Sequence, residues 1–506
     1  MKKIYTIEQF GAVADGVKDN SEAFSRAFEC VKNSGDEVEI YFSPKAAYYF
    51  VGISMEPLES ALVLKNLKKL TLIGDDTVIL CGNARPYMYM DGCENVTVKG
   101  LIFDQKIRAH FVGEICEVDA ENLTAVVKAD RSFPMEEHYD ANHGCYFGVH
   151  DTGEKLSRIY YFIEGYDWVD RKRSLLKVRF QSEDCIGTHY NVKNRLNKGQ
   201  RLILPTPGIG HCGHRAFTIQ YNSNISFIDC KLWNAPYFVF ALWNNRGTVL
   251  FRNFSAAPPI EETVDFVSWR DTFHCKTNTA KIIWDGCTVR GSNDDIINLS
   301  VNMLYISKFN SSTDIECVWK ETGGSYCSER FDITGEPVVI WNLKTGKLLG
   351  RTKIKSVVDY EKNHYILEDP IDSSQTGEDV KLCVESHIAP GSVIKNCDFR
   401  GTLRIKCNHT VKDSKLYLLR MWIDFAKDWE GPLPHDVLFE NVDFYVDDPD
   451  DKTYIISCYN SVFDKKTGDC YRLENIVFRN CRGLRKGNFL YDVNFEENSV
   501  DEISIC

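Results

Sequence analysis

Three aspartates stand in two short motifs whose residue types suit acid–base chemistry. The motifs are Ser268-Trp-Arg-Asp-Thr-Phe-His274 and Gly291-Ser-Asn-Asp-Asp-Ile-Ile-Asn298. Like charges held close together raise one another's pKa, so a group of carboxylates can supply a protonated acid beside an ionised base. Hydrolysis of a glycosidic bond requires such a pair. Asp271, Asp294 and Asp295 are therefore the predicted catalytic residues.

The spacing of the two motifs fits one turn of a repeating strand scaffold. Asp294 follows Asp271 by 23 residues (294 − 271), and the intervening segment 281–289 has the pattern of a strand and a tight turn. Stacked coils of a parallel β-helix lie about 4.7–4.9 Å apart, so a residue one coil later lies almost above its predecessor. Neighbouring strand residues point to opposite faces, so Asp294 and Asp295 can share a cleft only at a bend. Gly291-Ser-Asn293 is predicted to supply that bend.

Seven segments share a pattern of alternating apolar residues, then a turn-tolerant polar residue or glycine, then a small inward-facing residue. We place these segments on stacked strands; they are 95–104, 224–233, 281–291, 392–401, 410–416, 436–445 and 475–483. Equivalent positions hold Cys230, Cys287, Cys397 and Cys481, with Leu101, Ser414 and Val442 as counterparts. The pattern predicts an interior ladder of compact side chains and buried free thiols, since 19 cysteines cannot all pair within one chain.

The remaining sequence divides around these coils. Residues 21–31 carry apolar side chains at helical spacing and are expected to cap the first coil, whose open end would expose its interior. We predict a cap with the first coils over 1–104, an inserted β-rich subdomain over 105–200 and central coils over 201–302. A second insert is predicted over 303–388 and C-terminal coils over 389–506. Insertions in solenoids gather on the ligand-binding face, so both inserts are expected to wall the cleft.

Composition limits the kinds of partner. A formal net charge of −12 and a pI near 5.6 argue against binding nucleic acid and weakly disfavour a polyanionic polysaccharide, whereas a neutral ligand fits. The first ten residues lack the apolar core of a signal peptide, and no later stretch has eighteen uncharged apolar residues. We expect a cytoplasmic protein with no membrane contact, unless a leader has been removed. The oligomeric state stays open, a homo-oligomer included.

The motifs together resemble those of a known group of enzymes. Phe10-Gly-Ala-Val-Ala-Asp-Gly16, the helical cap, the coil pattern and both aspartate motifs are similar to the pectin-lyase-like parallel β-helix enzymes, and within them to glycoside hydrolase family 110. The resemblance spans almost the whole chain. It implies an all-β fold, namely a right-handed single-stranded parallel β-helix with an N-terminal capping helix and inserted β-barrel-like subdomains. It also implies an exo-acting, inverting α-1,3-galactosidase that acts on neutral galactose-terminated oligosaccharides.

The resemblance assigns roles to individual residues. Asp294 would be the general acid, and Asp271 and Asp295 would orient and deprotonate the attacking water. The predicted substrate-binding residues are His274, Asn298, Trp243 and Trp233; His274 would hold a sugar hydroxyl or a catalytic carboxylate, and the aromatic rings before Asp271, Tyr237 included, would stack on a sugar face. No cofactor and no metal are expected. His211-Cys-Gly-His214 has the spacing of metal ligands, but no second cluster completes a tetrahedral set.

Two other functions stay open. A polygalacturonase-like hydrolase of the same fold also uses three aspartates and often carries Arg-Ile-Lys for uronate, which is present here as Arg404-Ile-Lys406. The Gly-His-Gly expected one coil after the paired aspartates is replaced by Asn302-Met-Leu-Tyr-Ile306. The second alternative is a non-catalytic β-helix adhesin or carbohydrate-binding protein. Such a protein would not require three converging carboxylates.

Overall fold

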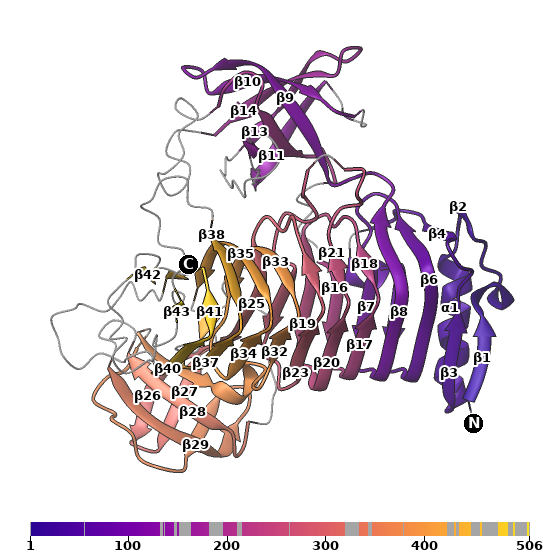
Figure 1. Cartoon of the computed structure of the whole chain (residues 1–506). Helices are drawn as coiled ribbons and strands as arrows, with labels where there is room; N and C mark the ends of the chain where they lie inside the picture. The colour runs from indigo at the N-terminus through magenta and orange to yellow at the C-terminus, as the bar shows by residue number, and fades with distance from the viewer. Residues whose placement is uncertain are drawn as a thin grey trace.

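Parallel strands wind into a β-helix that forms the body of the molecule (Figure 1). The computed structural model describes residues 2–54, 56–131, 135, 137–145, 149–150, 163–181, 196–209, 215–262, 264–318, 333–342, 347–377, 379–422, 430–431, 435–446, 456–457, 474–483, 489–490 and 503–504. Within these residues, one 30-stranded sheet includes both β1 (Lys2–Thr6) and β43 (Ile503–Ser504). The predicted all-β parallel β-helix is confirmed.

The central coils stack in a regular register on the side that carries the aspartate motifs. These strands are β16 (Arg215–Gln220), β19 (Phe238–Trp243), β22 (Phe273–Lys276), β25 (Asp295–Asn302), β33 (Asp398–Arg404) and β35 (Lys415–Trp422), each paired in parallel with the next. Inward side chains stack from coil to coil; the rings of Phe240 and Phe273 lie 5.3 Å apart and nearly parallel. Burial of this apolar interior, at about 25 cal/mol per Å², stabilises the coils.

The other strands of the β-helix and the short helices complete the coils and their ends. They are η1 (Ile7–Phe10), β2 (Asp15–Asp19), β3 (Glu37–Tyr41), β4 (Ala47–Phe50), η2 (Pro57–Glu59), β5 (Leu62–Lys65), β6 (Lys68–Cys81), β7 (Met88–Asp91), β8 (Glu94–Gln105), β17 (Ser223–Ile228), β18 (Lys231–Leu232), β20 (Arg246–Arg252), β21 (Ser255–Ala256), β23 (Lys281–Asp285), β24 (Thr288–Val289), η3 (Glu385–His387), β32 (Val393–Lys395), β34 (His409–Lys412), β36 (Glu430–Gly431), β37 (His435–Glu440), β38 (Asp443–Val446), β39 (Ile456–Ser457), β40 (Glu474–Arg479), β41 (Cys481–Arg482) and β42 (Phe489–Leu490). Apart from β36, which pairs antiparallel with β25, these strands follow the same winding path, so each coil contributes several short strands.

A residue in the left-handed conformation turns the chain at an equivalent point of each coil. Positive φ values of 49° to 68° occur at Gly100, Asp229, Asn253, Gly286, Asn396, Asp413, Asn441 and Asn480. Glycine adopts this conformation freely, and asparagine and aspartate adopt it more readily than other residues. The structure therefore confirms the turn-tolerant position of the sequence pattern. Its physical cause is the left-handed backbone conformation, which most residues with a Cβ adopt only at a cost.

The residue after each of these turns faces the interior and forms the predicted ladder. The amide of Asp398 donates to the carbonyl of Cys287 at 2.9 Å, and that of Lys415 donates to the carbonyl of Cys397 at 2.8 Å. These hydrogen bonds place Cys287, Cys397 and Ser414 on successive coils. All four predicted cysteines of the ladder are buried and free, which confirms their register.

The sequence prediction missed one coil. Strands β20 and β21 lie between β17 and β23, and they place Phe254 in the ladder between Cys230 and Cys287. Phe254 packs edge-on against Phe240 at 5.3 Å and against Phe251 at 5.8 Å. The coil was missed because the interior is wide enough here for a ring, which breaks the pattern of small residues.

Helix α1 (Ser21–Ser34) covers the N-terminal end of the β-helix (Figure 1). Its buried side chains are Ala23, Phe24, Ala27, Phe28 and Val31, and Gly35, with φ at 66°, ends it. The predicted cap is therefore confirmed. In the described part of the chain, no helix is both long and apolar enough to cross a membrane.

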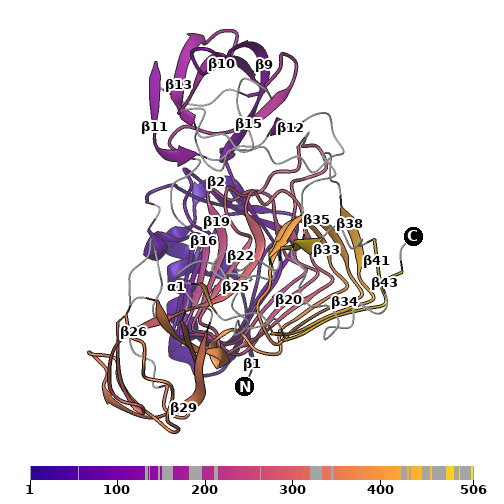
Figure 2. The same ribbon diagram turned by 90° about the vertical axis from the view of Figure 1, so that its left-hand side faces the viewer.

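The first stretch outside the coils forms a separate antiparallel sheet. Its strands are β9 (His110–Asp119), β10 (Thr124–Ala129), β11 (His138–Cys145), β12 (Val149–His150), β13 (Ile163–Asp170), β14 (Leu175–Phe180) and β15 (Arg201–Pro205). The sheet projects from the β-helix (Figures 1 and 2). A barrel-like insert was predicted over 105–200, but the described strands form an open sheet whose edges are β11 and β12.

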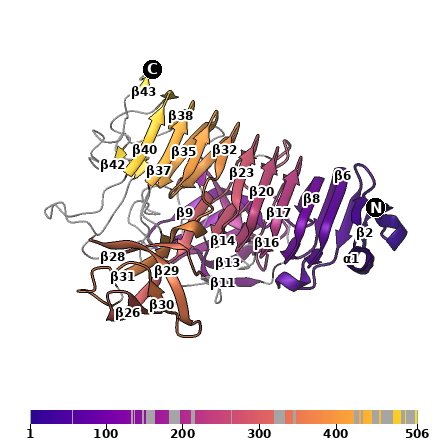
Figure 3. The same ribbon diagram turned by 90° about the horizontal axis from the view of Figure 1, so that it is seen from below.

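The second stretch outside the coils forms a closed barrel. Its strands are β26 (Leu304–Ser311), β27 (Asp314–Val318), β28 (Pro337–Asn342), β29 (Leu348–Asp359), β30 (His364–Leu367) and β31 (Val380–Val384). Figure 3 shows the barrel beside the C-terminal half of the β-helix. The chain leaves the coils after β25 and returns at β32, and β33 pairs directly with β25. The barrel, where an insert was predicted over 303–388, thus interrupts two adjacent coils without separating them.

Candidate active site

The three predicted catalytic aspartates converge on the outer face of two adjacent coils. Strand β22 pairs with β25 so that His274 lies opposite Asn298, and the amide of Thr272 donates to the carbonyl of Asp295 at 3.0 Å. One carboxylate oxygen from each of Asp271, Asp294 and Asp295 lies within 4.8 Å of the others. The fold thus brings Asp271 next to Asp294 and Asp295, which follow it in the chain by 23 and 24 residues.

A glycine at the start of the second motif brings the two coils together. Gly291 has φ at 83°, and a Cβ there would lie 2.5 Å from the backbone N and Cα of Phe266. The amide of Val267 donates to the carbonyl of Gly291 at 2.7 Å, and Ser268 and Ser292 form a parallel bridge. The chain then bends at Asn293 and Asp294, where the sequence predicted a bend.

Asp271 is buried and held by the histidine of its own motif. His274 Nδ1 lies 2.6 Å from Asp271 Oδ2, and only 4% of the Asp271 side chain is exposed. The imidazole also packs edge-on against Phe238, with ring centroids 4.9 Å apart. The contact with a carboxylate is one of the two that the sequence analysis expected of His274.

Asp294 is the most exposed of the three and pairs with an arginine that sequence reasoning missed. Arg270 Nη1 donates to Asp294 Oδ2 at 2.6 Å, and 34% of the Asp294 side chain is exposed. The Arg270 guanidinium also lies over the rings of Tyr237 and Phe238, at 5.7 and 5.8 Å from their centroids. Arg270 directly precedes Asp271 in the first motif, and this position could have marked it as a residue of the site. Its contact with Asp294, however, depends on the stacking of two coils.

Asp295 is buried between a neighbouring coil and the asparagine of its own motif. Arg404 Nε lies 3.5 Å from Asp295 Oδ2, and Asn298 Nδ2 donates to the same oxygen at 3.3 Å. Only 5% of the Asp295 side chain is exposed. Arg404 was noted in the sequence as a candidate for uronate binding, whereas the structure places it in an ion pair with a carboxylate of the trio.

The aromatic candidates for sugar stacking are placed less favourably. Trp243 is buried, and the Arg215 guanidinium lies 4.5 Å from its ring centroid, so one ring face is covered. Burial lowers the pKa of Arg215 to about 10. Trp233 is partly exposed after β18, where its amide donates to the carbonyl of Phe103 at 3.0 Å. A role in substrate binding for Trp233 and Trp243 stays a prediction.

The carboxylate trio has the ligand chemistry to hold a divalent cation, but its surroundings oppose one. Oxygens of three carboxylates within 4.8 Å are suitable ligands for Ca²⁺ or Mg²⁺. Each carboxylate, however, already has a basic partner in His274, Arg270 or Arg404. A cation would have to compete with these partners. The other motif considered for metal binding, His211-Cys-Gly-His214, lies outside the described residues.

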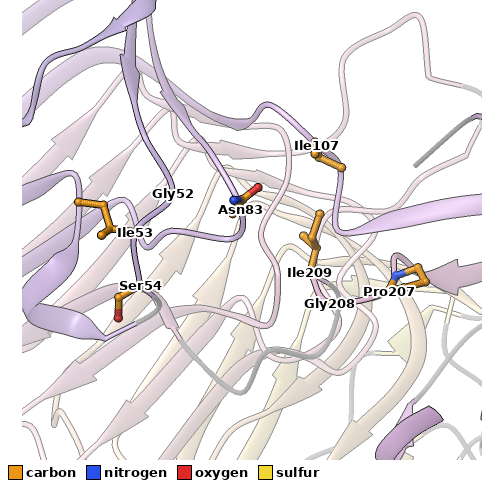
Figure 4. Close-up of a pocket in the computed structure, with 8 residues that line it drawn as sticks. All are labelled: Gly52, Ile53, Ser54, Asn83, Ile107, Pro207, Gly208 and Ile209. Atoms are coloured by element: carbon orange, nitrogen blue, oxygen red, sulfur yellow. The ribbon is translucent and has the colours of Figure 1, made fainter. Parts of the chain in front are cut away.

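A separate pocket lies near the base of the first antiparallel sheet (Figure 4). Its volume is about 340 Å³, and its lining residues are Gly52, Ile53, Ser54, Asn83, Ile107, Pro207, Gly208 and Ile209. None of these side chains can exchange a proton near neutral pH. The pocket therefore offers no acid–base chemistry.

No protein-family model matches the chain, and no curated protein matches it. Among solved structures, it is similar to the catalytic unit of a GH87 α-1,3-glucanase from Streptomyces thermodiastaticus, with a TM-score of 0.41 and 8% identity over 96% of this chain and 57% of that one. A family 28 exopolygalacturonase from Yersinia enterocolitica gives a TM-score of 0.41 and 11% identity over 95% of this chain and 72% of that one. The Agl-KA catalytic domain gives 0.38 and 8% over 94% of this chain and 53% of that one.

The chain spans about half the length of the Agl-KA and GH87 domains, 53% and 57%. Likenesses this remote do not define a substrate or an activity, because one fold can host many functions.

Proposed function

We propose that the chain is an exo-acting glycoside hydrolase that releases terminal α-1,3-linked galactose from neutral oligosaccharides with inversion. The observation that carries this proposal is the convergence of Asp271, Asp294 and Asp295 on the outer face of the coils. Like charges this close are costly unless each has a partner, and two of the three carboxylates, Asp271 and Asp295, are also buried. Carboxylates gathered in this way make the place a candidate for acid–base chemistry. The sugar and the linkage come from the family resemblance of the two motifs.

The exposures of the three carboxylates support different roles. Asp294 has 34% of its side chain exposed and would reach the oxygen of the leaving group as the general acid. Asp271 and Asp295, at 4% and 5%, are fixed by their partners and would orient and deprotonate the attacking water. The Arg270 guanidinium contacts Asp294 Oδ2, so the substrate has to displace it before Asp294 can reach the oxygen of the leaving group.

The stereochemical part of the proposal rests on the resemblance and not on the spacing. Inverting glycosidases hold their acid and base roughly 6.5–9.5 Å apart, whereas retaining enzymes hold theirs about 5–5.5 Å apart. The nearest oxygens of the trio lie within 4.8 Å, which is shorter than the inverting range. The anomeric configuration of the first sugar released, followed by NMR, therefore decides between the two mechanisms.

The structure of the Arg-Ile-Lys segment bears on the polygalacturonase alternative. Arg404 lies 3.5 Å from Asp295, which brings a positive charge into the site, as binding of a uronate would require. The Lys406 side chain, however, is completely buried and cannot reach a surface-bound sugar. This arrangement favours a neutral substrate over a polyuronate.

A panel of substrates tests the proposal directly. We expect release of galactose from α-1,3-linked digalactosides and from p-nitrophenyl α-galactoside. Polygalacturonate should stay intact. Cleavage of polygalacturonate without release of galactose would support the alternative hydrolase. Binding of an oligosaccharide without any hydrolysis, unchanged when the aspartates are replaced by asparagine, would support a carbohydrate-binding protein.

A further inference from the structure

A lysine is buried beside the candidate site, two residues beyond His274 on β22. Lys276 lies on β22, in register with Trp243 on β19 and with Ser300 on β25, and it is 5% exposed. Burial of an ammonium group is unfavourable unless its donors are satisfied. An apolar side chain would be buried here at lower cost. We therefore expect the ammonium group of Lys276 to make a specific contact.

The lysine meets the side-chain amide of the second motif. Lys276 Nζ donates to Asn298 Oδ1 at 3.4 Å and also donates to Ser300 Oγ. Ser300 Oγ in turn donates to Asn298 Oδ1 at 3.1 Å. Two donors thus converge on one amide oxygen. Because an ammonium group can only donate, the oxygen of Asn298 has to face Lys276 and the amide nitrogen has to point away from it.

The orientation of this amide determines what Asp295 receives. Asn298 Nδ2 donates to Asp295 Oδ2 at 3.3 Å. If the amide were turned round, its oxygen would face an acceptor, and the contact would be repulsive instead of attractive. Arg404 from β33 and the carboxylates of Asp271 and Asp294 also face Asp295. Lys276 contacts Asn298, and Asn298 contacts Asp295, so the amide links the lysine to the carboxylate.

We propose that Lys276 is a positioning residue of the site, which fixes the side-chain amide of Asn298 so that this amide holds the carboxylate of Asp295 in place for its reaction with water. This inference rests on the proposed function in assigning Asp295 to the activation of water. The hydrogen-bond relay from Lys276 through Asn298 to Asp295 does not depend on which sugar is cleaved.

Substitutions at Lys276 test the relay through activity. Lys276→Met removes every donor, whereas Lys276→Gln keeps an uncharged donor of similar reach. We expect kcat on the digalactoside to fall by about 10–100-fold in Lys276→Met, the loss found for residues that orient metal-binding side chains in the same way, with a smaller fall in Lys276→Gln. KM should change much less than kcat, because the loss falls on the reaction and not on binding. Lys381→Met, which removes another buried lysine from β31 in the barrel, is the matched control and should keep full activity.

A double-mutant cycle tests whether the lysine acts through Asn298. If it does, Lys276→Met combined with Asn298→Ala should be no worse than Asn298→Ala alone, because the second change removes the group that the lysine orients. Multiplicative losses in the double variant would show that Lys276 acts by another route and would overturn the inference.

A measurement independent of hydrolysis separates this inference from the proposed function. In protein labelled with ¹³C at the aspartate carboxyl carbon, the Asp295 resonance can be assigned with the Asp295→Asn variant. We expect its titration midpoint to rise in both Lys276→Met and Asn298→Ala, because the ionised carboxylate loses an oriented donor. An unchanged midpoint in a folded Lys276→Met protein would overturn the inference even if galactosides are cleaved. A raised midpoint in a protein that cleaves no galactoside would preserve the relay and reject the proposed function.

Discussion

The interior and the outer face of the same coils are organised in opposite ways. Inside, Cys287 stacks on Cys397 and Cys397 stacks on Ser414, and each contacts the equivalent residue of the next coil. Outside, Asp271, Asp294 and Asp295 each have a different partner from a different place in the chain. The interior therefore repeats the same kind of contact from coil to coil, whereas each aspartate on the outer face makes a contact of its own.

The two regions therefore tolerate change differently. Equivalent interior positions hold leucine, cysteine, phenylalanine, serine and valine, which shows that size and burial are the requirement there. On the outer face the requirement is a particular hydrogen bond or charge. A substitution inside the coil should therefore cost stability, and one on the outer face should cost activity.

The largest effect is expected at the carboxylate trio. Replacement of Asp294, Asp271 or Asp295 by asparagine keeps the shape but removes proton transfer, so each variant should lose about 10²–10⁴-fold in rate. Asp294→Asn should keep relatively more activity on p-nitrophenyl galactoside than on a digalactoside, because a good leaving group needs less help from an acid. Asp271→Asn and Asp295→Asn should be impaired equally on both substrates, as steady-state kinetics would measure. Equal impairment of Asp294→Asn on both substrates would contradict its assignment as the acid.

A smaller effect is expected at the glycine that brings the two coils together. Gly291 and Gly335 have φ values of 83° and 82°, so alanine should cost each about 1–2 kcal/mol of backbone strain. Only at Gly291 would the new Cβ meet backbone atoms at 2.5 Å, whereas nothing lies within 4 Å of it at Gly335. A shift of the motif by about 1 Å can cost about 10²-fold in rate. Gly291→Ala should therefore lose activity and melt lower than Gly335→Ala, and equal behaviour of the two would mean that this contact does not position the site.

A change inside the ladder should affect stability alone. Cys287→Ala should lower the free energy of unfolding by about 1–2 kcal/mol, a usual cost for a buried substitution, and should leave the rate of hydrolysis unchanged. Thiol labelling mapped by mass spectrometry gives a second test. Cys30 and Cys116 are partly exposed and should react in the native protein, whereas burial raises the pKa of Cys230 to about 12 and should protect it until denaturant is added. Rapid native labelling of Cys287 would contradict the interior register.

The smallest effect is expected from removal of metal ions. Asp271, Asp294 and Asp295 are already paired with His274, Arg270 and Arg404, and a cation would have to compete with these partners. Treatment with EDTA should leave the rate of galactose release unchanged. Loss of activity that returns on addition of Ca²⁺ or Mg²⁺ would show that the trio binds a cation in spite of its basic neighbours.

Much of the fold could be predicted because its rules are local. The turn positions favour Gly, Asn or Asp because φ is positive there, and the residue after each of them is buried. Both positions can therefore be recognised from residue types alone. The coil that contains Phe254 was not predicted, because a large ring stands there in place of the small residue of the pattern. The first insert was expected to be barrel-like and is an open sheet in the described residues, since the closure of a sheet depends on pairing between distant strands.

The sequence alone determined the coil period, the inward ladder and the spacing that brings Asp271 next to Asp294 and Asp295, because these follow from residues within one or two turns of each other. Only the tertiary structure decided the partners of the trio. The ion pair of Asp295 with Arg404 joins residues on either side of the whole inserted barrel, and it forms because β25 and β33 become neighbours. No local pattern encodes that contact, since it depends on where the barrel returns the chain to the coils.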